Sequence, residues 1–578
     1  MENVLNALLF RSLSVDIHSS DIAQMAEHDD IGKRNGYDEF DENIEVGHNE
    51  KTEVDLEDGP AAVRTDDVEV QSVHGLKREL KSRHLQMIAV GGTIGTGIFL
   101  SSGSSVAQAG PAGALVAYII VGIMVYFIVT SLGEMAAYLP VPGAFSTFGT
   151  RFVDPALGFC LGWNYWLQWA ISIPTEVVAA GIIIQFWAPN LQSWIPALVF
   201  IVVLVITNLI GVQVYGELEY WFALIKVITC ILFIFVGIFV DAGVAGGNKI
   251  SFTNWTIEGA PFVGGALNVF TTCLLAFFSF GGTEMVSITA GESSNPRKAV
   301  PKAVNQVFWR ILLFYVLSIF IIGLCIPYDD PSLVDAAYGD LNDAVKIAPF
   351  TKVFQMAGFP GADHAINAIL LTSVLSAGNS CFYACTRTLM ALGREGKAPK
   401  ILGKCNKRGV PVWALVVTTI FACLAFIADI FGSGNVFTWL INLTGLSALL
   451  TWMSISVIHI RFRAAMKAQG RSLKDLPYRA PFFPYGCYIA IILGLVVLVS
   501  DIYYAVTTTP FEAVNIIGVL IGLPFFFLFF ISWKIFKRSK FVRASEADLD
   551  TGRSILIVEE AADEVKQPWW KKILFFLA

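Results

Sequence analysis

Apolar runs of roughly 20 residues alternate with short polar or basic segments from Leu85 to Phe536. A helix needs about 20 consecutive apolar residues to cross the hydrocarbon core of a bilayer, because each residue adds about 1.5 Å. The pattern therefore predicts an all-α integral membrane protein with twelve transmembrane helices. The predicted spans are 85–109, 112–138, 155–187, 192–211, 219–241, 264–290, 308–326, 364–392, 412–431, 435–459, 484–506 and 513–536.

The two ends of the chain differ in composition from the apolar centre. The first 84 residues hold acidic runs such as EHDD and DEFDENIE and few aromatic residues, which predicts a disordered tail. Most of the formal net charge of -7 therefore belongs to the tails rather than to the membrane part. The predicted organisation is an acidic N-terminal tail (1–84), a twelve-span membrane domain (85–537) and a C-terminal tail (538–578).

Lys and Arg residues gather in the segments on one side of the predicted spans. KRELKSRH precedes the first span, and NPRKAVPK, GREGKAPKILGKCNKRG and RFRAAMKAQGRSLK follow the sixth, eighth and tenth. Because basic loops remain in the cytoplasm, an even number of spans with both termini cytoplasmic satisfies every loop. Asn254-Trp255-Thr256 is then an outward-facing glycosylation sequon, with Asn254 as the acceptor.

Two predicted spans carry glycine-rich stretches at corresponding places in two five-helix halves. GGTIGTGIF runs from Gly91 to Phe99, and FFSFGGTEM runs from Phe277 to Met285. A glycine in a helix interior costs about 1 kcal/mol relative to alanine. Such a pair is typical of inverted-repeat transporters, in which helices 1 and 6 are broken around a site near the bilayer midplane. Close helix packing through a GxxxG pair and a kink without function are the alternatives.

A broken helix exposes backbone groups that can bind a ligand. The N–H groups at the start of one half-helix favour an anion such as a carboxylate. The freed C=O groups at the end of the other half-helix favour a cation such as an ammonium group. A site that offers both suits a zwitterion, so the backbone chemistry alone suggests an amino acid.

Ionisable residues within the predicted spans are the second chemical signal, because each costs roughly 3 kcal/mol or more at the bilayer centre. They are Glu134, Glu176, Lys226, Glu284 and Asp501. Lys226 lies about two turns into its span, and a proton that comes and goes there could couple transport to a proton gradient. A permanent ion pair is the alternative. Glu284 directly follows the second glycine break, where a proton or a substrate can reach it; helix capping is its alternative.

Several long motifs resemble a known family. GGTIGTGIFLSSG, SLGEMAAYLPVPGAF, GTEMVSITAGESSNPRKAVPKAV and LSAGNSCFYACTRTLMALGREGKAPK are similar to motifs of fungal amino acid permeases of the amino acid–polyamine–organocation (APC) superfamily. The similarity extends from about Leu76 to Arg543. The resemblance implies two inverted five-helix repeats plus two extra C-terminal helices, and proton-coupled uptake of L-amino acids at the plasma membrane.

The resemblance also implies roles for individual residues. The substrate carboxylate binds the break in the first span, the amino group binds carbonyls of the sixth, and an aromatic residue at Phe278 gates the site. Lys226 matches a lysine that replaces a sodium ion of related carriers, and Glu284 joins it as a proton-coupling candidate. The implied substrate-binding residues are Thr93, Ile94, Gly95, Thr96, Gly97, Gln168, Glu176, Phe278, Ser279, Phe280, Gly281, Thr283 and Thr444.

The motifs leave the substrate open between classes of amino acid. ITAGES and INLTG resemble permeases for arginine and lysine, LQWAISIPTEVV resembles broad-range permeases, and VDPALGF resembles carriers of acidic amino acids. Gly281 stands where the family usually has glutamine or alanine, which widens the site. Glu176 is the nearest candidate acceptor for a cationic side chain. Similar carriers of neutral amino acids also have this glutamate, so it could equally serve the amino group. Cationic substrates are favoured, with a broad range as the alternative.

The remaining expectations concern partners and rival functions. No cofactor or metal and no nucleic acid is expected, since the proton gradient supplies the driving force. Lysines of the tails could accept ubiquitin, which implies contacts with ubiquitin-ligase adaptors. A nutrient sensor of the same fold is the rival function. An enzyme is not expected, because no HExxH or GxSxG constellation lies on a membrane face.

Overall fold

The computed structural model describes residues 94–141, 143–210, 212–290, 295–338, 348–406, 408–507 and 521–553. These residues form helices joined by turns and bends, and they contain no strand. The predicted N-terminal tail, the first half of the first span with Thr93, the start of the twelfth span and the end of the C-terminal tail lie outside the described residues.

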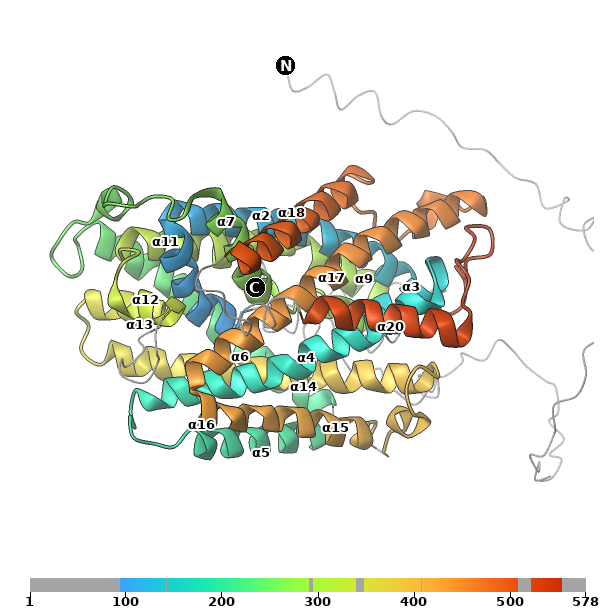
Figure 1. The fold of residues 1–578 in the computed structure, drawn as a ribbon, viewed down its shortest axis with the longest axis horizontal. Helices are drawn as coiled ribbons and strands as arrows, with labels where there is room; N and C mark the ends of the chain where they lie inside the picture. Colours follow the sequence, from blue (N-terminus) through green and yellow to red (C-terminus); the bar gives the residue numbers. More distant parts are fainter. Residues whose placement is uncertain are drawn as a thin grey trace, which may run out of the picture. The chain divides into compact units, whose positions relative to one another are not determined.

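The described helices follow the predicted spans closely through most of the chain (Figure 1). In the first half they are η3 (Gly97–Ser101), α2 (Ser102–Tyr138), α3 (Ala144–Phe152), α4 (Pro155–Gln185), α5 (Trp194–Ile210), α6 (Val212–Asp241), η4 (Ser251–Trp255), α7 (Gly265–Phe280), α8 (Met285–Thr289), α9 (Pro296–Asn305), α10 (Val307–Arg310), η6 (Ile311–Val316) and α11 (Leu317–Cys325). In the second half they are α12 (Pro331–Tyr338), α13 (Pro349–Met356), α14 (Ala362–Arg394), η7 (Lys400–Gly403), α15 (Val412–Ala422), η8 (Cys423–Ile427), α16 (Ala428–Phe431), α17 (Ser433–Ala468), η9 (Leu473–Asp475), α18 (Tyr485–Thr507) and α20 (Gly522–Lys537).

Nine helices among the described residues are long and apolar enough to cross a membrane, and Trp194–Ile210 is a shorter apolar helix. One of the nine, Gly97–Tyr138, contains both the first and the second predicted span. The two spans are separated inside it at Gly110, whose φ of 76° lies in the left-handed region and is followed by Pro111. The freed backbone groups there pair with the segment before α7, because Ala112 N–H donates to Pro261 O at 3.1 Å. The chain is thus a multi-pass helical membrane protein.

Three basic or polar segments that the hydropathy pattern assigns to loops are helical. The predicted loop before 308 contains α9, which begins at Pro296 behind the capping side chain of Asn295. The tenth span continues past its predicted end at 459 as α17 runs to Ala468. α3 lies between the second and third spans. Hydropathy marks only the part of a helix that faces lipid or core, whereas Ala, Arg, Lys and Met continue a helix readily beyond it.

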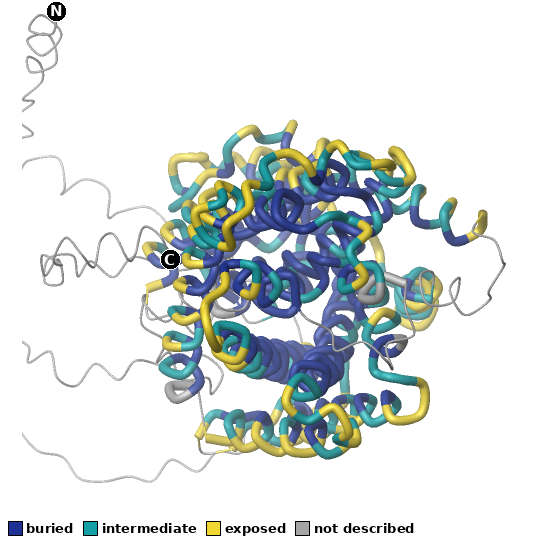
Figure 2. Tube along the Cα trace, turned by 90° about the vertical axis from the view of Figure 1, so that its left-hand side faces the viewer, coloured by how far each residue is buried: buried dark blue, intermediate teal, exposed yellow. Residues whose placement is uncertain are grey.

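The long helices lie side by side (Figure 1), and buried residues gather along the helices in the middle of the molecule (Figure 2). α4 packs most extensively against α14 and α17. In its most apolar stretch 89% of the residues are buried, compared with 28% for α18. A helix buried on all sides can carry polar groups that point to other protein groups rather than to lipid, so α4 is placed to line a site.

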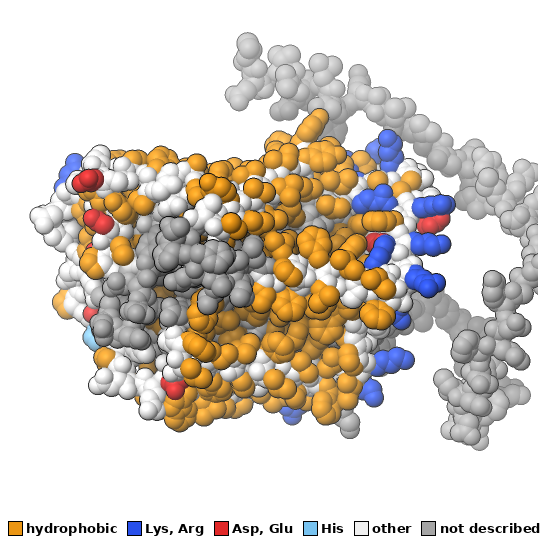
Figure 3. Space-filling model, viewed as in Figure 1, with side chains coloured by type: hydrophobic (Ala, Val, Ile, Leu, Met, Phe, Trp, Pro, Cys, Tyr) orange, Lys and Arg blue, Asp and Glu red, His pale blue; other side chains and the backbone are white. Residues whose placement is uncertain are grey.

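Figure 3 shows Lys and Arg side chains gathered at one end of the helices, while apolar side chains cover the middle of the visible face. We call this the basic end. Residues 538–553, the start of the predicted C-terminal tail, pack there. Val542 N–H donates to Val153 O at 2.9 Å, and Arg461 donates to Val542 O at 2.5 Å. This part of the tail therefore belongs to the packed structure.

Asp154 connects the start of α4 to the C-terminal segment. Its Oδ1 accepts hydrogen bonds from Ala156 N–H and from the Ser539 hydroxyl, both at 2.8 Å, and its Oδ2 binds Lys534. Burial alone would raise the pKa of Asp154, but the hydrogen bonds from Lys534 and Ser539 outweigh it and hold that pKa below its ordinary value. Asp154 is therefore both the N-cap of α4 and an anchor for the chain beyond α20.

Glu134, one of the ionisable residues within the spans, lies near the basic end of α2 and is fully buried. It accepts from Arg463 at 2.5 and 2.7 Å, from the Ala480 N–H at 2.7 Å, and faces His459 Nε2 at 3.0 Å. All these partners come from α17 and the segment that follows it. Glu134 therefore joins α2 to α17 and is structural.

We expect Glu134→Ala to lower the free energy of unfolding by about 3–5 kcal/mol, because it leaves the partly buried Arg463 guanidinium without its carboxylate and the buried His459 without its partner. Thermal unfolding of the purified protein in detergent measures the loss. Thr130→Ala is the matched control, since its hydroxyl bonds only to Tyr126 O and Phe127 O of its own helix. A loss for Glu134→Ala no larger than that for Thr130→Ala would contradict the structural role.

Candidate substrate site

The sixth predicted span is interrupted where the second glycine pair lies. α7 ends at Phe280, and the backbone turns at Gly281 with ψ 141° and at Gly282 with φ 94°. Helical structure resumes at Met285 in α8. The last four C=O groups of a helix have no intrahelical partner, so α7 presents carbonyl oxygens and the negative end of its dipole at this break. The prediction of an interruption in this span is confirmed.

The described part of the first span begins with a bend at Ile94 and Gly95, and the helix starts at Gly97. The residues before it lie outside the described part, so only the second half of the predicted break is described. A helix that begins at Gly97 presents its first backbone N–H groups and the positive end of its dipole toward the bend.

The start of η3 in the first span touches the end of α7 at Gly97. A side-chain carbon added there would overlap the Cα atom of Ser279 and come within 2.9 Å of its hydroxyl oxygen. Ser279 is held by α2 and η3, because its hydroxyl lies 2.8 Å from that of Tyr118 on α2 and 3.5 Å from that of Ser101 on η3. Glycine at this position is therefore what allows the positive end of one helix and the negative end of the other to approach.

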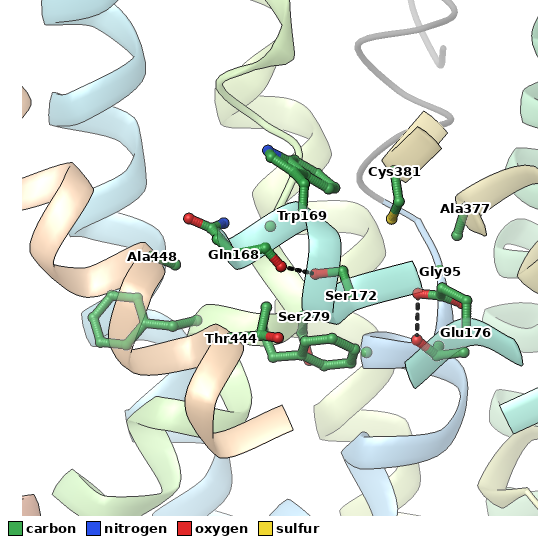
Figure 4. Close-up of a pocket in the computed structure, with 15 residues that line it drawn as sticks. Gly95, Gln168, Trp169, Ser172, Glu176, Ser279, Ala377, Cys381, Thr444 and Ala448 are labelled. Atoms are coloured by element: carbon green, nitrogen blue, oxygen red, sulfur yellow. Dashed lines mark hydrogen bonds between the residues drawn. The ribbon is translucent and has the colours of Figure 1, made fainter. Parts of the chain in front are cut away.

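A cavity lies beside this contact and holds, with its mouth, about 460 Å³ of space that no atom occupies (Figure 4). Five helical elements contribute to its wall: the bend before η3, α4, α7 with its break, α14 and α17. The lining residues are Gly95, Thr96, Gly97, Gln168, Trp169, Ser172, Glu176, Phe277, Phe278, Ser279, Gly281, Ala377, Cys381, Thr444 and Ala448.

Glu176 is the carboxylate in this wall. Its Oε1 accepts a hydrogen bond from the Thr96 hydroxyl at 2.9 Å, which connects α4 to the bend of the first span (Figure 4). Its Oε2 is buried and has no hydrogen-bond partner among the described residues, and the same is true of Gln168 Oε1. Buried polar atoms are nearly always satisfied, so two such oxygens in one cavity indicate a ligand with hydrogen-bond donors.

The structure brings most of the predicted substrate-binding residues together. Gly95, Thr96, Gly97, Gln168, Glu176, Phe278, Ser279, Gly281 and Thr444 line the cavity. Ile94, Phe280 and Thr283 are buried but do not line it. The Phe280 ring stacks on Tyr315 with centroids 4.1 Å apart, so this residue supports the break from behind. Thr93 lies outside the described residues.

Sequence reasoning missed Trp169, Ser172, Phe277, Ala377, Cys381 and Ala448 as lining residues. Helical spacing could have found two of them. Ser172 lies four residues from both Gln168 and Glu176, and Ala448 lies four residues after Thr444, so they share helix faces with predicted residues. Ala377 and Cys381 have the same mutual spacing on α14, but small apolar side chains carry no chemical signal of a site.

The two predicted proton-coupling residues lie outside the wall of the cavity. Lys226 is fully buried on α6, with Nζ 4.0 Å from Glu219 Oε1, and it interacts electrostatically with Glu176. Glu219 is a partner that sequence analysis did not single out. Glu284 is fully buried just before α8; its Oε2 lies 3.5 Å from the Thr283 hydroxyl, and its Oε1 has no hydrogen-bond partner among the described residues. Its role in coupling stays a prediction.

Asn254, the predicted glycosylation acceptor, lies in η4 and is 9% exposed. Its amide nitrogen donates to Leu324 O at 2.6 Å. Modification would require this side chain to leave that contact, so the sequon stays a prediction and the structure gives it no support. Among the described residues, no group of three or more His, Cys, Asp or Glu side chains could hold a metal ion.

A helical membrane protein with a polar cavity between an interrupted span and the start of another helix has features typical of solute carriers. The sequence pattern of the family described as "Amino acid permease" matches residues 84–546. This chain belongs to the amino acid permease family, a family of the APC superfamily, and its function is the transport of amino acids across a membrane.

Similar proteins occur in bacteria and fungi. The lysine-specific permease of Escherichia coli (strain K12) is 47% identical over 473 residues, which cover 82% of this chain and 96% of that relative. The histidine permease of Lactococcus lactis subsp. cremoris is 46% identical, covering 83% of this chain and 99% of the relative. The general amino-acid permease of Saccharomyces cerevisiae is 40% identical, covering 87% and 86%. These relatives are transporters rather than enzymes.

Proposed function

We propose that this permease imports L-amino acids together with protons, that it prefers cationic amino acids, and that it works by alternating access. The twelve predicted spans would form two inverted five-helix repeats and two extra C-terminal helices. The protein would lie in the plasma membrane with both termini, and hence the basic end, in the cytoplasm. The observation that carries the proposal is the cavity at the contact of the two interrupted spans, with its two unsatisfied oxygens on Gln168 and Glu176.

The backbone of the interrupted spans would recognise the part that all amino acids share. The N–H groups at 94–97 and the positive end of the helix that starts at Gly97 favour the substrate carboxylate. The carbonyl groups at the end of α7, from Ser279 to Gly281, favour the ammonium group. Phe278 would cover the substrate from one side as the gating aromatic residue.

The side-chain preference would be set by α4 and α17. Gln168 and Glu176 lie eight residues apart on α4, which places them about 12 Å apart along the helix axis. An extended lysine whose α-ammonium group lies at Glu176 could therefore direct its side-chain ammonium group toward the Gln168 oxygen and Thr444. Relatives named as lysine-specific and histidine permeases support a cationic substrate, and relatives named as general permeases support the broad-range alternative.

Lys226 and Glu284 would carry the coupling proton. Lys226 lies within electrostatic reach of Glu176, which lines the cavity, so its charge state and substrate binding would influence each other. The proton gradient would replace any cofactor. Ubiquitin-ligase adaptors would contact the tails, and the lipid bilayer and the amino acid complete the expected partners. A nutrient sensor of the same fold is the alternative function.

Uptake of labelled lysine, competed by each standard amino acid at acidic and at neutral external pH, tests the proposal. The protein is expressed in cells that lack their own lysine uptake. We expect arginine, lysine and histidine to compete strongly, and uptake to be faster at acidic pH. If neutral amino acids inhibit lysine uptake as strongly as cationic amino acids do, the broad-range alternative is favoured. Uptake independent of both external pH and the membrane proton gradient would contradict proton symport.

A further inference from the structure

α6 carries a line of ionisable and hydroxyl side chains on one face. Tyr215, Glu219 and Lys226 lie four and seven residues apart, and these spacings place them within about 40° of one another around the helix. All three side chains are buried: Glu219 and Lys226 are 0% exposed, and Tyr215 is 3% exposed. Charged side chains within a transmembrane helix cost free energy, and those that occur there usually have a functional role.

The geometry of the pair follows from the helix. Side chains of an α-helix tilt toward its N-terminus, so the long chain of Lys226 reaches back over two turns toward Glu219. Its Nζ lies 4.0 Å from Glu219 Oε1. This separation is longer than a hydrogen bond and allows a small rotamer change or one water molecule to join the two groups.

The pair has a substrate side and an opposite side. On the substrate side, Glu176 and Cys381 interact electrostatically with Lys226, and both line the substrate cavity. Cys230, one turn after Lys226 on α6, also interacts electrostatically with that lysine. On the opposite side, the Ser376 hydroxyl donates to Glu219 Oε1 at 2.8 Å. Ser380 lies one turn further along α14, close to this carboxylate but without a hydrogen bond to it, and Glu219 Oε2 has no hydrogen-bond partner among the described residues. Lys226 thus stands between Glu176 and Glu219.

Hydroxyl groups continue from Glu219 to a second cavity. The Ser380 hydroxyl lies 3.2 Å from that of Tyr215, whose ring stacks on Tyr383 with centroids 4.3 Å apart. The lining residues of the second cavity are Asn208, Tyr215, Tyr383, Thr386, Arg387, Val410 and Leu415. It lies near the start of α6 and the end of α14, which is toward the basic end.

We infer that Glu219 accepts the coupling proton from Lys226 and passes it, through Ser380 and Tyr215, toward the second cavity at the basic end. This inference rests on the proposed function, since it names the route for the proton assumed there. One N–H bond of the Lys226 ammonium breaks and an O–H bond forms on the Glu219 carboxylate. The ion pair becomes a neutral amine and a neutral carboxylic acid, so the net charge within the spans does not change in this step.

The second step returns both groups to their starting state. The carboxylic acid of Glu219 releases its proton through the hydroxyl groups to water in the second cavity, and the carboxylate forms again. Lys226 then takes up a proton from the substrate side. A residue that only neutralised Lys226 would need no hydroxyl connection on its far side, whereas a relay requires one.

Reconstituted full-length protein in lipid vesicles separates the two readouts that matter. Exchange of labelled for unlabelled lysine at equal pH measures binding and alternating access without net proton flow. Accumulation of lysine driven by a pH gradient measures coupling. We expect Glu219→Gln to keep exchange and to lose gradient-driven accumulation by at least about tenfold. Thr229→Val is the matched control, since this buried hydroxyl on α6 bonds only to Ile225 O.

Two results would overturn the inference. In the first, the Glu219→Gln protein keeps both lysine exchange and gradient-driven accumulation. In the second, the Glu219→Gln protein folds but loses exchange and accumulation equally, as expected if Glu219 is only a structural partner. If Glu219→Gln does not fold, Tyr215→Phe decides, because it keeps the ring and removes the hydroxyl. Reduced accumulation with normal exchange supports the route, and unchanged accumulation refutes it. Lys226→Met separates the proposed proton symport from the proposed relay. If the Lys226→Met protein still accumulates lysine, the proposed coupling at Lys226 is wrong. If Lys226→Met loses accumulation but Glu219→Gln keeps it, only the relay through Glu219 is wrong.

Discussion

Lys226→Met should lower the accumulation of lysine against its gradient by about 5- to 150-fold while exchange of lysine across the membrane continues. Methionine fills a similar volume but cannot carry a proton, so substrate binding no longer responds to protonation at this position. Coupling between two sites is typically worth about 5- to 150-fold in affinity, and a loss of accumulation in this range is expected. Flux measured in vesicles with and without a pH gradient checks the prediction.

Lys352→Met is the matched control for this experiment. Lys352 lies on α13, pairs with Asp330 at 3.3 Å and is partly exposed, so its loss should leave coupling intact. Because Lys226→Met leaves the Glu219 carboxylate buried without its cation, the double variant K226M/E219Q removes both charges and guards against loss of folding. Accumulation that remains fully pH-dependent in a folded Lys226→Met or K226M/E219Q protein would show that the coupling proton binds elsewhere.

The transmembrane helices and the interruption of the sixth span could be predicted because both depend on residues that are close together in the sequence. Apolar runs mark a span, and the consecutive glycines Gly281 and Gly282 mark the place where helical hydrogen bonding stops. The extents of α9 and α17 could not be read in the same way. Their ends are basic and lie outside the apolar window, where helix propensity and capping by Asn295 determine the structure.

The site divides along the same line. Glu176 is an ionisable residue in an apolar span, which marks it in the sequence, whereas Gln168 and Thr444 are predicted through the resemblance to the permease family. Ala377 and Cys381 line the same cavity because α14 packs against α4, a relation between helices far apart in the chain that no local pattern contains. Glu219 was missed for a related reason: it lies at the first position of a predicted span, whereas α6 begins at Val212 and Glu219 is completely buried.

The two interrupted spans and the Lys226–Glu219 pair address different parts of the transport cycle. The contact of Gly97 with Ser279 brings backbone charges together that recognise any amino acid, and it contains no group that titrates. Lys226 and Glu219 titrate but do not line the substrate cavity. Glu176 connects them, since it lines the cavity and acts on Lys226. Substrate recognition and proton binding can therefore be removed separately: Gly97→Ala should affect substrate recognition, and Lys226→Met should affect proton binding.

Gly97→Ala should weaken substrate binding by about 5- to 150-fold while the protein still inserts into the membrane. The added methyl group would overlap the Cα atom of Ser279, which is backbone and cannot turn away as a side chain could. The start of η3 and the end of α7 must then separate, and the N–H and C=O groups that receive the zwitterion no longer face one ligand. Overpacking of this kind costs about 1–3 kcal/mol, or about 5- to 150-fold in affinity. Stabilisation of the purified protein against heat by added lysine measures the binding.

Two further glycine variants provide affinities with which that of Gly97→Ala can be compared. At Gly95 an added carbon would meet Ala377 Cβ at 3.2 Å and Glu176 Oε1 at 3.9 Å, so Gly95→Ala should weaken binding less than Gly97→Ala. At Gly181, on the same helix as Gln168, the nearest atom would be Pro196 Cγ at 3.8 Å, and Gly181→Ala should have no effect. The order of affinities follows from where the two interrupted spans touch. Equal affinities of the Gly97→Ala and Gly181→Ala proteins for lysine would mean that the contact between Gly97 and Ser279 does not form the binding site.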